Sequence, residues 1–420
     1  MIREVVHVSP IALPEESELA RIPPRPLEFR MPDYEQKFDY RSLIYDVFHY
    51  HSDIAAIGPP LLNLKEPAKG FTYRAHDRPL RAYFSDMNRV SRWVFKDASK
   101  LYLPRWIRGR RPLSRRSPSD LLRLLGTGDR GQPQPFPGGA LTVSFGKEVT
   151  ASAAIGPNLR HLFANCRCLL TKSKNNELQW IHDWVKFHVN SHQADATLIY
   201  DNGSDKYPAR EILDSLAGIA GLKVAVVVKW PFKWGVHGDD FGIWDSDFAQ
   251  HGILEHARWR FLEFARSVVY QDVDELALSG RSIFEIAEQS KTGTVLYEGR
   301  WIEHVRPQRS ATTAAVPRHA DFRYFRPDVA PASTKWCTVP SRNRRSRQWR
   351  VHWIKPAEKT EEIQLRHFRA ISTGWKHDRS PEPFDASIYR EDTELVRALA
   401  EADLPDSSAE RPSSGQIAAS

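Results

Sequence analysis

The feature that most constrains the fold is a regular alternation of strand-like and helix-like segments between residues 166 and 275. Apolar, β-branched runs at 166–172, 196–200 and 222–228 are each followed by a segment with apolar residues at helical spacing behind a polar or proline cap. The unbroken apolar character of 222–228 is typical of a strand buried on both faces. The pattern predicts an α/β fold with a doubly wound, mainly parallel sheet, whose ligands bind beyond the carboxyl ends of the strands.

A fourth apolar run, 267–271, ends in Asp272, Asp274 and Glu275. If the strand continues to its last residue, alternation places Asp272 and Asp274 on one face and Glu275 on the other. Converging carboxylates require a cation or solvent, and the hard ions Mg²⁺ and Mn²⁺ prefer oxygen ligands. These residues alone leave two interpretations open, a metal–diphosphate site and a solvated acidic strand end.

Two further polar segments follow predicted strands, Lys174-Asn175-Asn176-Glu177 and Asp201-Asn202-Gly203-Ser204. Because the carboxyl ends of parallel strands meet at one edge of a sheet, we expect these segments and 272–275 to form one crevice. In that arrangement they surround one cation and one pyrophosphate.

These motifs resemble those of the GT-A-type glycosyltransferases, particularly the branch similar to families 2 and 92. The matching segments are 174–177 with the following Trp180, Ile181 and His188, then 199–204, 271–275, Lys335-Trp336 and 367–369. The resemblance covers about 165–375 and implies a GT-A-like fold. It also implies transfer of a sugar from a nucleotide-sugar donor to a glycan, polysaccharide or other hydroxyl acceptor. Leu276 stands where a common form of the acidic motif has Phe, and nothing in the motifs specifies the sugar.

The resemblance further implies roles for single residues. The donor nucleotide would be bound by residues at the strand ends: Lys174, Asn175, Glu177, Asp201, Asn202, Ser204 and Asp272. A Mn²⁺ or Mg²⁺ ion would be held by Asp272, Asp274 and His367, with Asp274 the foremost ligand. The ion would neutralise charge on the leaving nucleoside diphosphate, assisted by cations for which Lys335, Arg366 and Arg369 are candidates.

An inverting transfer also requires a carboxylate that accepts the proton of the acceptor hydroxyl. The sequence offers Glu303, Glu298, Asp239 and Asp240, of which we favour Glu303, after the apolar run 294–297, with Asp239 as the next catalytic candidate. Three tryptophans between the third and fourth strands either stack on sugar rings or pack their loop onto the sheet: Trp230, Trp234 and Trp244.

We place the GT-A-like domain at 161–375. The sequence on either side of it predicts further units. Residues 1–30 are rich in proline and predict an extended arm. Short apolar-aromatic runs over 31–160 predict a mainly β accessory domain with a basic loop near 104–140. Residues 376–420 predict a partly disordered C-terminal extension with a short helix near 393–402.

Composition and charge indicate the cellular compartment in which we expect the protein. With 41% apolar and 27% charged residues, the 420-residue chain is typical of a soluble protein, and no apolar run reaches the roughly 18–20 residues that cross a bilayer. Three cysteines suggest neither a disulfide framework nor a zinc site, so we expect a cytoplasmic protein. Arginine clusters at 105–116 and 342–350 predict either solvated loops or anion-binding surfaces, including peripheral contact with a membrane.

Two other functions fit part of the sequence. A haloacid-dehalogenase-like phosphotransferase also has Asp-x-Asp after an apolar strand, with Asp272 as nucleophile, but that fold has the motif at its first strand. A basic nucleic-acid-binding protein would account for the arginine clusters but leaves the carboxylates without a role. We therefore expect no specific nucleic-acid partner.

Overall fold

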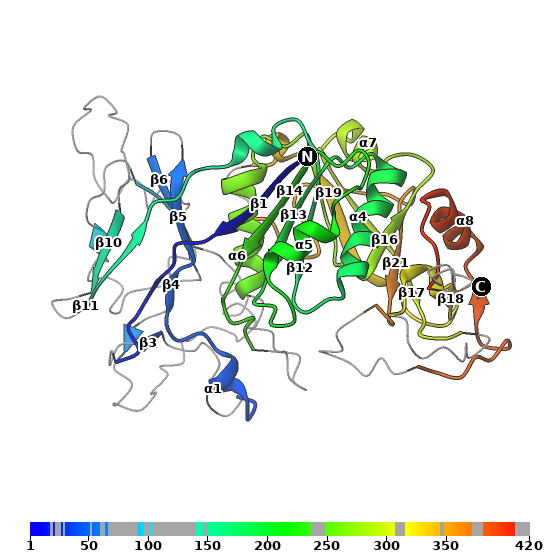
Figure 1. The fold of residues 1–420 in the computed structure, drawn as a ribbon, viewed down its shortest axis with the longest axis horizontal. Helices are drawn as coiled ribbons and strands as arrows, with labels where there is room; N and C mark the ends of the chain where they lie inside the picture. Colours follow the sequence, from blue (N-terminus) through cyan, green and yellow to red (C-terminus); the bar gives the residue numbers. More distant parts are fainter. Residues whose placement is uncertain are drawn as a thin grey trace, which may run out of the picture.

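The computed structural model describes residues 1–16, 20–21, 27, 30–50, 53–58, 64–65, 91–95, 101–102, 140–145, 149–236, 248–306, 316–344, 348–371 and 381–407. Every structural statement below concerns these residues. Their largest element is a ten-stranded sheet with helices packed on its faces, so the chain has a mixed α/β fold (Figure 1).

One half of the sheet is entirely parallel. Its strands are, in spatial order, β1 (Ile2–His7), β14 (Val224–Lys229), β13 (Ala196–Asp201), β12 (Arg167–Ser173) and β15 (Ser267–Tyr270). Each neighbouring pair in this series runs parallel. The carboxyl ends of all five strands therefore lie along one edge, as the alternating pattern predicts.

The other half is mixed. After β15 come β19 (Ala332–Thr338), β17 (Thr294–Ile302), β21 (Gln364–Phe368) and β16 (Glu275–Leu278), and β20 (Glu358–Lys359) pairs with β17. Only β19 and β16 run antiparallel to their neighbours. Because β17 and β21 are parallel to each other and have the direction of β15, their carboxyl ends lie at the same edge as the end of β15.

Helices cover both faces of the sheet, which makes three layers. One face packs against α4 (Leu178–His192), α5 (Ala209–Ser215) and α7 (Ile283–Gln289), and the other against α6 (Phe248–Ala257) and the π-helix that continues it, Arg258–Leu262. Along β12, Leu169 faces the first layer while Cys168 and Leu170 face the second. Helices and strands thus lie where their periodicity predicts them.

The N-terminal segment differs from the expected extended arm. Residues Ile2–His7 are extended, but they form the edge strand of the large sheet, with Ile2 opposite Val224 and His7 opposite Lys229. The segment has the short β-branched pair Val5-Val6 that a buried edge strand requires, and Val6 is buried. The start of the chain therefore completes the sheet.

Between 31 and 160 the described residues form mainly short strands, with one short helix, α1 (Tyr34–Lys37). An antiparallel sheet contains β5 (Asp46–Tyr50), β6 (Asp53–Gly58) and β8 (Ser91–Phe95), and a second contains β9 (Leu101–Tyr102), β10 (Ala140–Phe145) and β11 (Val149–Ala154). Phe48 and Ile57 belong to the same hydrophobic core as β12 to β15. The division into an accessory domain and a main domain stays a prediction, and the basic loop near 104–140 falls almost entirely outside the described residues.

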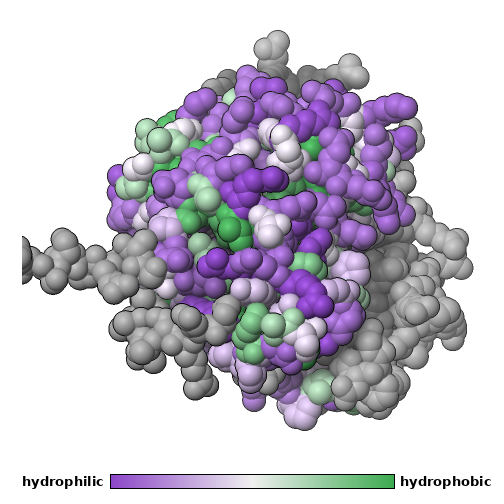
Figure 2. Space-filling model, turned by 90° about the vertical axis from the view of Figure 1, so that its right-hand side faces the viewer, coloured by the Kyte–Doolittle hydropathy of each residue, from purple (hydrophilic) through white to green (hydrophobic). Residues whose placement is uncertain are grey.

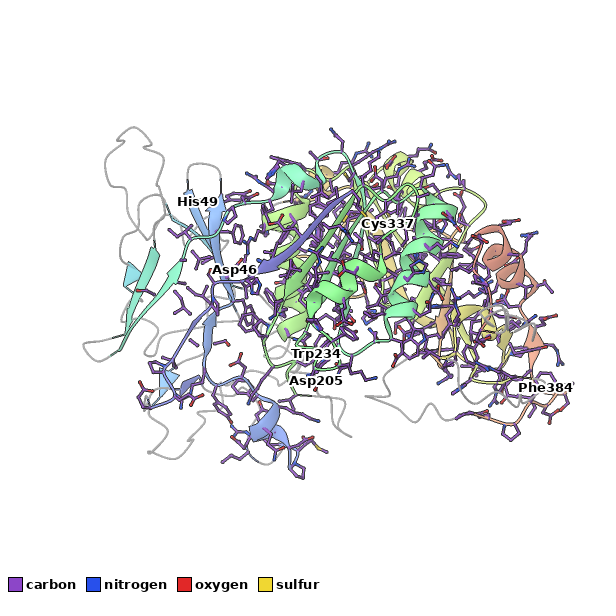
Figure 3. The ribbon with its side chains drawn as sticks, in the orientation of Figure 1. Asp46, His49, Asp205, Trp234, Cys337 and Phe384 are labelled. Atoms are coloured by element: carbon purple, nitrogen blue, oxygen red, sulfur yellow. The ribbon has the colours of Figure 1, made fainter. Side chains whose placement is uncertain are left out.

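A buried polar network joins this segment to the large sheet. Asp46 accepts hydrogen bonds from the Ser9 backbone N–H at 2.7 Å and from His256 Nε2 at 2.7 Å, and it pairs with Arg260. The other nitrogen of His256, Nδ1, lies 2.8 Å from the Tyr200 hydroxyl, which is positioned to donate to it. Burial lowers the pKa of His256, although Asp46 opposes the shift, so the imidazole stays neutral. Figure 3 shows Asp46 on the side of β5 that faces the sheet.

The C-terminal helix is confirmed as α8 (Thr393–Glu401). Asp392 caps its first turn, because its side chain accepts the Leu395 N–H at 3.0 Å, and the same carboxylate pairs with buried Arg366 on β21. In the described part of the chain, no helix has both the length and the apolar character needed to cross a membrane. The face near α8 is mostly hydrophilic, with small separate apolar patches (Figure 2).

Candidate functional site

The acidic segment leaves the sheet earlier than predicted. Strand β15 ends at Tyr270, and residues 272–275, called the acidic turn below, close a turn in which the Glu275 N–H donates to the Asp272 carbonyl at 3.0 Å. The prediction that Asp272 and Asp274 share one face of a strand while Glu275 opposes them is therefore wrong. Asp272 and Glu275 instead both contact Lys335, and Asp274 points to His367.

Side chains from other elements fix the backbone of this turn. His319 Nε2 donates to the Val273 carbonyl at 2.9 Å, Trp184 Nε1 to that of Glu275 at 3.0 Å, and His192 Nε2 to that of Ala277 at 2.7 Å. Trp184 and His192 lie on α4, and all three donors are buried. Alternate carbonyl oxygens from 273 to 277 are thus held by side-chain donors, which sets the position of the carboxylates.

Asp272 is bound by two lysines. Its Oδ1 pairs with Lys172 and its Oδ2 lies 2.6 Å from Lys335 Nζ, which also lies 2.9 Å from Glu275 Oε2. Burial disfavours the charged carboxylate, but the two ammonium groups outweigh it and hold the pKa of Asp272 well below its ordinary value. The side chain of Lys335 is 1% exposed and that of Lys172 14%. Asp272 is therefore an ionised centre that already has two cations.

Asp274 and His367 form a second pair. Asp274 Oδ2 lies 3.1 Å from His367 Nε2, and the other ring nitrogen, Nδ1, lies 3.5 Å from Glu275 Oε1. Burial alone would lower the pKa of His367, but the Asp274 carboxylate more than offsets this and raises it. The two side chains are 15% and 13% exposed, so a small ligand can reach them. A carboxylate oxygen and an imidazole nitrogen therefore converge at the edge of the sheet.

A third group of side chains lies beside this pair. Trp301 on β17 is opposite His367 on β21, and their rings stack with centroids 4.0 Å apart. The Arg369 guanidinium lies 4.6 Å from the Trp301 ring centroid, and its Nε lies 2.8 Å from Glu303 Oε2. Burial raises the pKa of Glu303, an effect that Arg369 only partly offsets. Within the described ranges the remaining oxygen of Glu303, Oε1, is buried without a hydrogen-bond partner.

Asp274 and His367 could hold a divalent cation if the ion displaces the proton between Oδ2 and Nε2, because the raised pKa of His367 favours the protonated ring and a metal ligand must be the neutral imidazole. Two ligands about 2.1 Å from an octahedral ion and at right angles lie about 3 Å apart, close to the observed 3.1 Å. The carboxylate suits Mg²⁺ or Mn²⁺, whereas imidazole is a ligand more typical of Zn²⁺, Cu²⁺, Fe²⁺ and Ni²⁺. Asp272 does not join them, because both of its oxygens are engaged by ammonium groups. Among the described residues, no group of three or more His, Cys, Asp or Glu side chains is arranged to hold a metal, so any further ligands would come from substrate or water.

The residues predicted to bind the nucleotide do come together, but several of them bind each other. Asn175, in a left-handed conformation with φ of 56°, accepts the Asp205 N–H through Oδ1 at 2.9 Å, and its own N–H donates to Ser204 Oγ at 2.9 Å. Asp201 accepts the Ser204 N–H at 3.0 Å, and Asn202 Nδ2 donates to the carbonyls of Trp230 and Phe232. These bonds shape the loops beyond β12, β13 and β14.

The remaining predicted nucleotide contacts are more exposed. Lys174 is exposed, and Glu177, which precedes α4, lies 3.0 Å from Lys206 through Oε1. Figure 3 shows Asp205 and Trp234 both at the carboxyl end of the parallel strands. The 174–177 and 201–204 segments thus form one loop cluster beside the acidic turn.

Three residues that we predicted to contact ligands make contacts within the protein instead. Trp230 is fully buried between Tyr45 and Tyr200 and packs the loop onto the sheet, so it offers no face to a sugar. Arg366 is fully buried against Asp392, and Lys335 is enclosed by carboxylates. Asp239, Asp240 and Trp244 lie outside the described residues. Trp234 is partly exposed, with Lys172 Nζ 5.2 Å from its ring centroid.

Two site residues had no sequence signal of their own. Lys172 is the sixth residue of an apolar strand, and only the parallel register, with Leu170 opposite Tyr270, shows that it lies beside Asp272. Trp301 similarly becomes part of the site through its pairing with His367. Of the second arginine cluster, Arg342 donates to the Ser290 carbonyl at 3.0 Å and packs over Gly293, which is a structural role.

Comparisons with known proteins find no related sequence. No protein-family model matches the chain, and no curated protein sequence is significantly similar to it. Among solved structures, the galactosyltransferase LgtC, crystallised in complex with donor and acceptor sugar analogues, aligns with 56% of this chain and 95% of its own at 10% identity. The TM-score of this alignment is 0.29, which does not establish a common fold.

Proposed function

We propose that the protein is a GT-A-like glycosyltransferase, which transfers a sugar from a nucleotide-sugar donor to a hydroxyl of a glycan or polysaccharide acceptor with inversion at the sugar carbon. The observation that carries the proposal is the placement of Asp274 and His367 beside Glu303. All three lie at the carboxyl-end edge of the sheet, linked by the Trp301 stack and the Arg369 ion pair. The motifs that resemble glycosyltransferases supply the reaction class.

In this proposal Asp274 and His367 hold a Mn²⁺ or Mg²⁺ ion, which when bound supplies Lewis-acid stabilisation to the leaving nucleoside diphosphate. His367 brings its Nε2 to the site because Trp301 fixes the ring plane and Glu275 faces Nδ1. Asp272 contributes through its two lysines rather than as a ligand of the ion. This assigns different tasks to the two aspartates of the Asp-x-Asp motif.

Glu303 is the proposed base. Its Oε2 is oriented by Arg369 and its Oε1 is left to accept a proton from the acceptor hydroxyl. The raised pKa of Glu303, caused by burial, makes the carboxylate a stronger base than an exposed glutamate. The side chain is only 4% exposed, so an acceptor hydroxyl reaches Oε1 only if neighbouring side chains move. Asp239 remains the alternative base.

The nucleotide of the donor is proposed to bind at the loop cluster of 174–177 and 201–204. Asp201 and the exposed Lys174 and Glu177 are the proposed contacts, and the loops are shaped by Asn175, Asn202 and Ser204. We place the protein in the cytoplasm, with peripheral membrane contact through the arginine clusters as a proposal.

A thermal-shift screen tests the proposal. Nucleotide sugars with uracil, guanine, cytosine or adenine bases are added with and without Mn²⁺, and a ligand that binds the folded state raises the unfolding temperature. We expect one nucleotide class to stabilise wild type in a Mn²⁺-dependent way. The same ligand should lose that dependence in Asp274→Ala. A screen in which no nucleotide sugar shifts wild type, with or without the ion, contradicts the proposed function.

A further inference from the structure

Lys172 lies between the two halves of the candidate site. In the spatial order β13, β12, β15, Lys172 on β12 is opposite Tyr200 of β13, and two residues earlier Leu170 is opposite Tyr270 of β15. The proposed nucleotide contact Asp201 ends β13 on one side, and the acidic turn follows β15 on the other, while the 174–177 loop continues from β12 itself. A diphosphate that joins a nucleotide on the first side to a sugar on the second has to cross the end of β12.

The Lys172 ammonium group has unused hydrogen-bonding capacity. An ammonium group has three N–H donors, and the only acceptor of Lys172 within the described residues is Asp272 Oδ1. Its other contact is the partly exposed Trp234 ring. Lys335 differs, because it is enclosed between Asp272 and Glu275 and is nearly inaccessible. Lys172 is therefore the lysine of the pair that can reach a ligand.

We propose that Lys172 binds the diphosphate of the nucleotide-sugar donor, and that Asp272, itself neutralised by Lys335, holds the Lys172 ammonium in position beforehand. A phosphate oxygen is a strong acceptor for a charged N–H donor. Because Lys335 keeps one positive charge on Asp272, the carboxylate is not left unpaired when Lys172 turns toward the ligand. This inference rests on the proposed function, and it adds a binding residue to it.

The test measures binding rather than turnover. Wild type, Lys172→Met, Lys172→Gln and Lys172→Arg are titrated calorimetrically with UDP, GDP, CDP, ADP and inorganic pyrophosphate, with and without Mn²⁺. We expect both neutral variants to bind the preferred diphosphate at least tenfold more weakly, and Lys172→Arg to stay within about threefold of wild type, because it keeps the charge. Lys223→Met is the matched control, since Lys223 pairs with Asp195 at 3.0 Å near the amino-terminal edge of the sheet; its diphosphate affinity should equal that of wild type.

The outcomes separate the two proposals. If wild type binds a diphosphate and both folded neutral variants bind it equally well, the role of Lys172 is overturned while the proposed function stands. If wild type binds none of the five probes in either condition, the proposed function fails and the role of Lys172 fails with it. A Mn²⁺ titration without nucleotide provides a second readout, in which the neutral variants should bind the ion at least as tightly as wild type, because removal of the Lys172 ammonium removes a positive charge that repels the ion. Circular dichroism and the unfolding temperature of each variant show whether it is folded.

Discussion

The imidazole of His367 lies almost flat against the indole of Trp301, with 4.0 Å between the ring centroids and 23° between the planes. The stack forms because the two residues are directly opposite on parallel strands. It fixes the ring so that Nε2 faces Asp274 and Nδ1 faces Glu275. The orientation of the proposed metal ligand is therefore set by packing within the protein.

Replacement of Trp301 tests this orientation. In Trp301→Ala the imidazole gains freedom to rotate, and we expect the Mn²⁺ affinity to fall about tenfold, as is usual when a group that orients a ligand is lost. Trp301→Phe retains a ring and should stay close to wild type. Calorimetric Mn²⁺ titration measures both, with Trp353→Ala, at an exposed tryptophan on the surface, as the control. Equal affinities in wild type and Trp301→Ala would show that the stack does not position His367.

Replacement of Asp274 tests the proposed metal site. We expect Asp274→Ala to lose Mn²⁺ binding and metal-dependent sugar transfer while remaining folded, because its side chain is partly exposed and its loss leaves no large cavity. The matched change is Asp403→Ala, at an exposed aspartate paired with Lys186. That variant should bind Mn²⁺ as wild type does. Unchanged turnover in folded Asp274→Ala would refute the assignment.

Replacement of Glu303 tests the proposed base. Glu303→Gln has nearly the same shape but cannot accept the proton, so we expect kcat to fall by about a hundredfold or more while the diphosphate affinity stays unchanged. Glu298→Gln is the comparison, because Glu298 lies exposed on the same strand. Steady-state kinetics with separate binding titrations distinguish the two effects. If Glu298→Gln loses activity and Glu303→Gln keeps it, the base has been assigned to the wrong residue.

The buried His192 predicts a loss of stability in mild acid. Burial lowers its pKa to about 4, against about 6.5 in the unfolded chain. Between these values the unfolded chain binds a proton that the folded protein does not, so stability is full above about pH 6.5 and is lost as the pH falls. At pH 5 the loss from this one group is about 2 kcal/mol.

Urea denaturation between pH 8 and pH 5 measures this effect. His192→Gln can still donate to the Ala277 carbonyl but no longer titrates, so its free energy of unfolding should fall by about 2 kcal/mol less than that of wild type over this range. Identical pH dependence in the two proteins would mean that His192 is not buried as a neutral group.

Much of the parallel half of the sheet could be predicted because its signals are local. The apolar runs and the helical spacing of 178–192 depend on neighbouring residues alone, and β12, α4, β13, α5, β14 and α6 lie within a few residues of the expected positions. Residues 2–7 show the limit of this reasoning. Their strand is recognised only through its pairing with β14, more than 200 positions away in the chain.

The sequence could anticipate some of the residues that lie together at the candidate site but not the contacts between them, and their role as a site stays a prediction. Asp272, Asp274 and His367 do come together, yet the tight turn arises from contacts of Glu275 with the Asp272 N–H and with Lys335, 60 residues later. Equally, sequence could not separate Trp230, which is buried in the core, from Trp234, which lies partly exposed beside Lys172. In each case the residue whose contact decides the arrangement is distant in the chain, so the spacing of residues within a motif does not predict it.

The three carbonyl bonds beneath the acidic turn have a consequence for how a donor can be accommodated. With Val273, Glu275 and Ala277 bonded to His319, Trp184 and His192, the backbone of the acidic turn cannot shift unless α4 and the segment of His319 shift too. Donor entry should therefore leave amide hydrogen exchange at 273–277 nearly as slow as before. Different donors would then have to be accommodated by changes in side-chain conformation, while the backbone of the turn stays fixed.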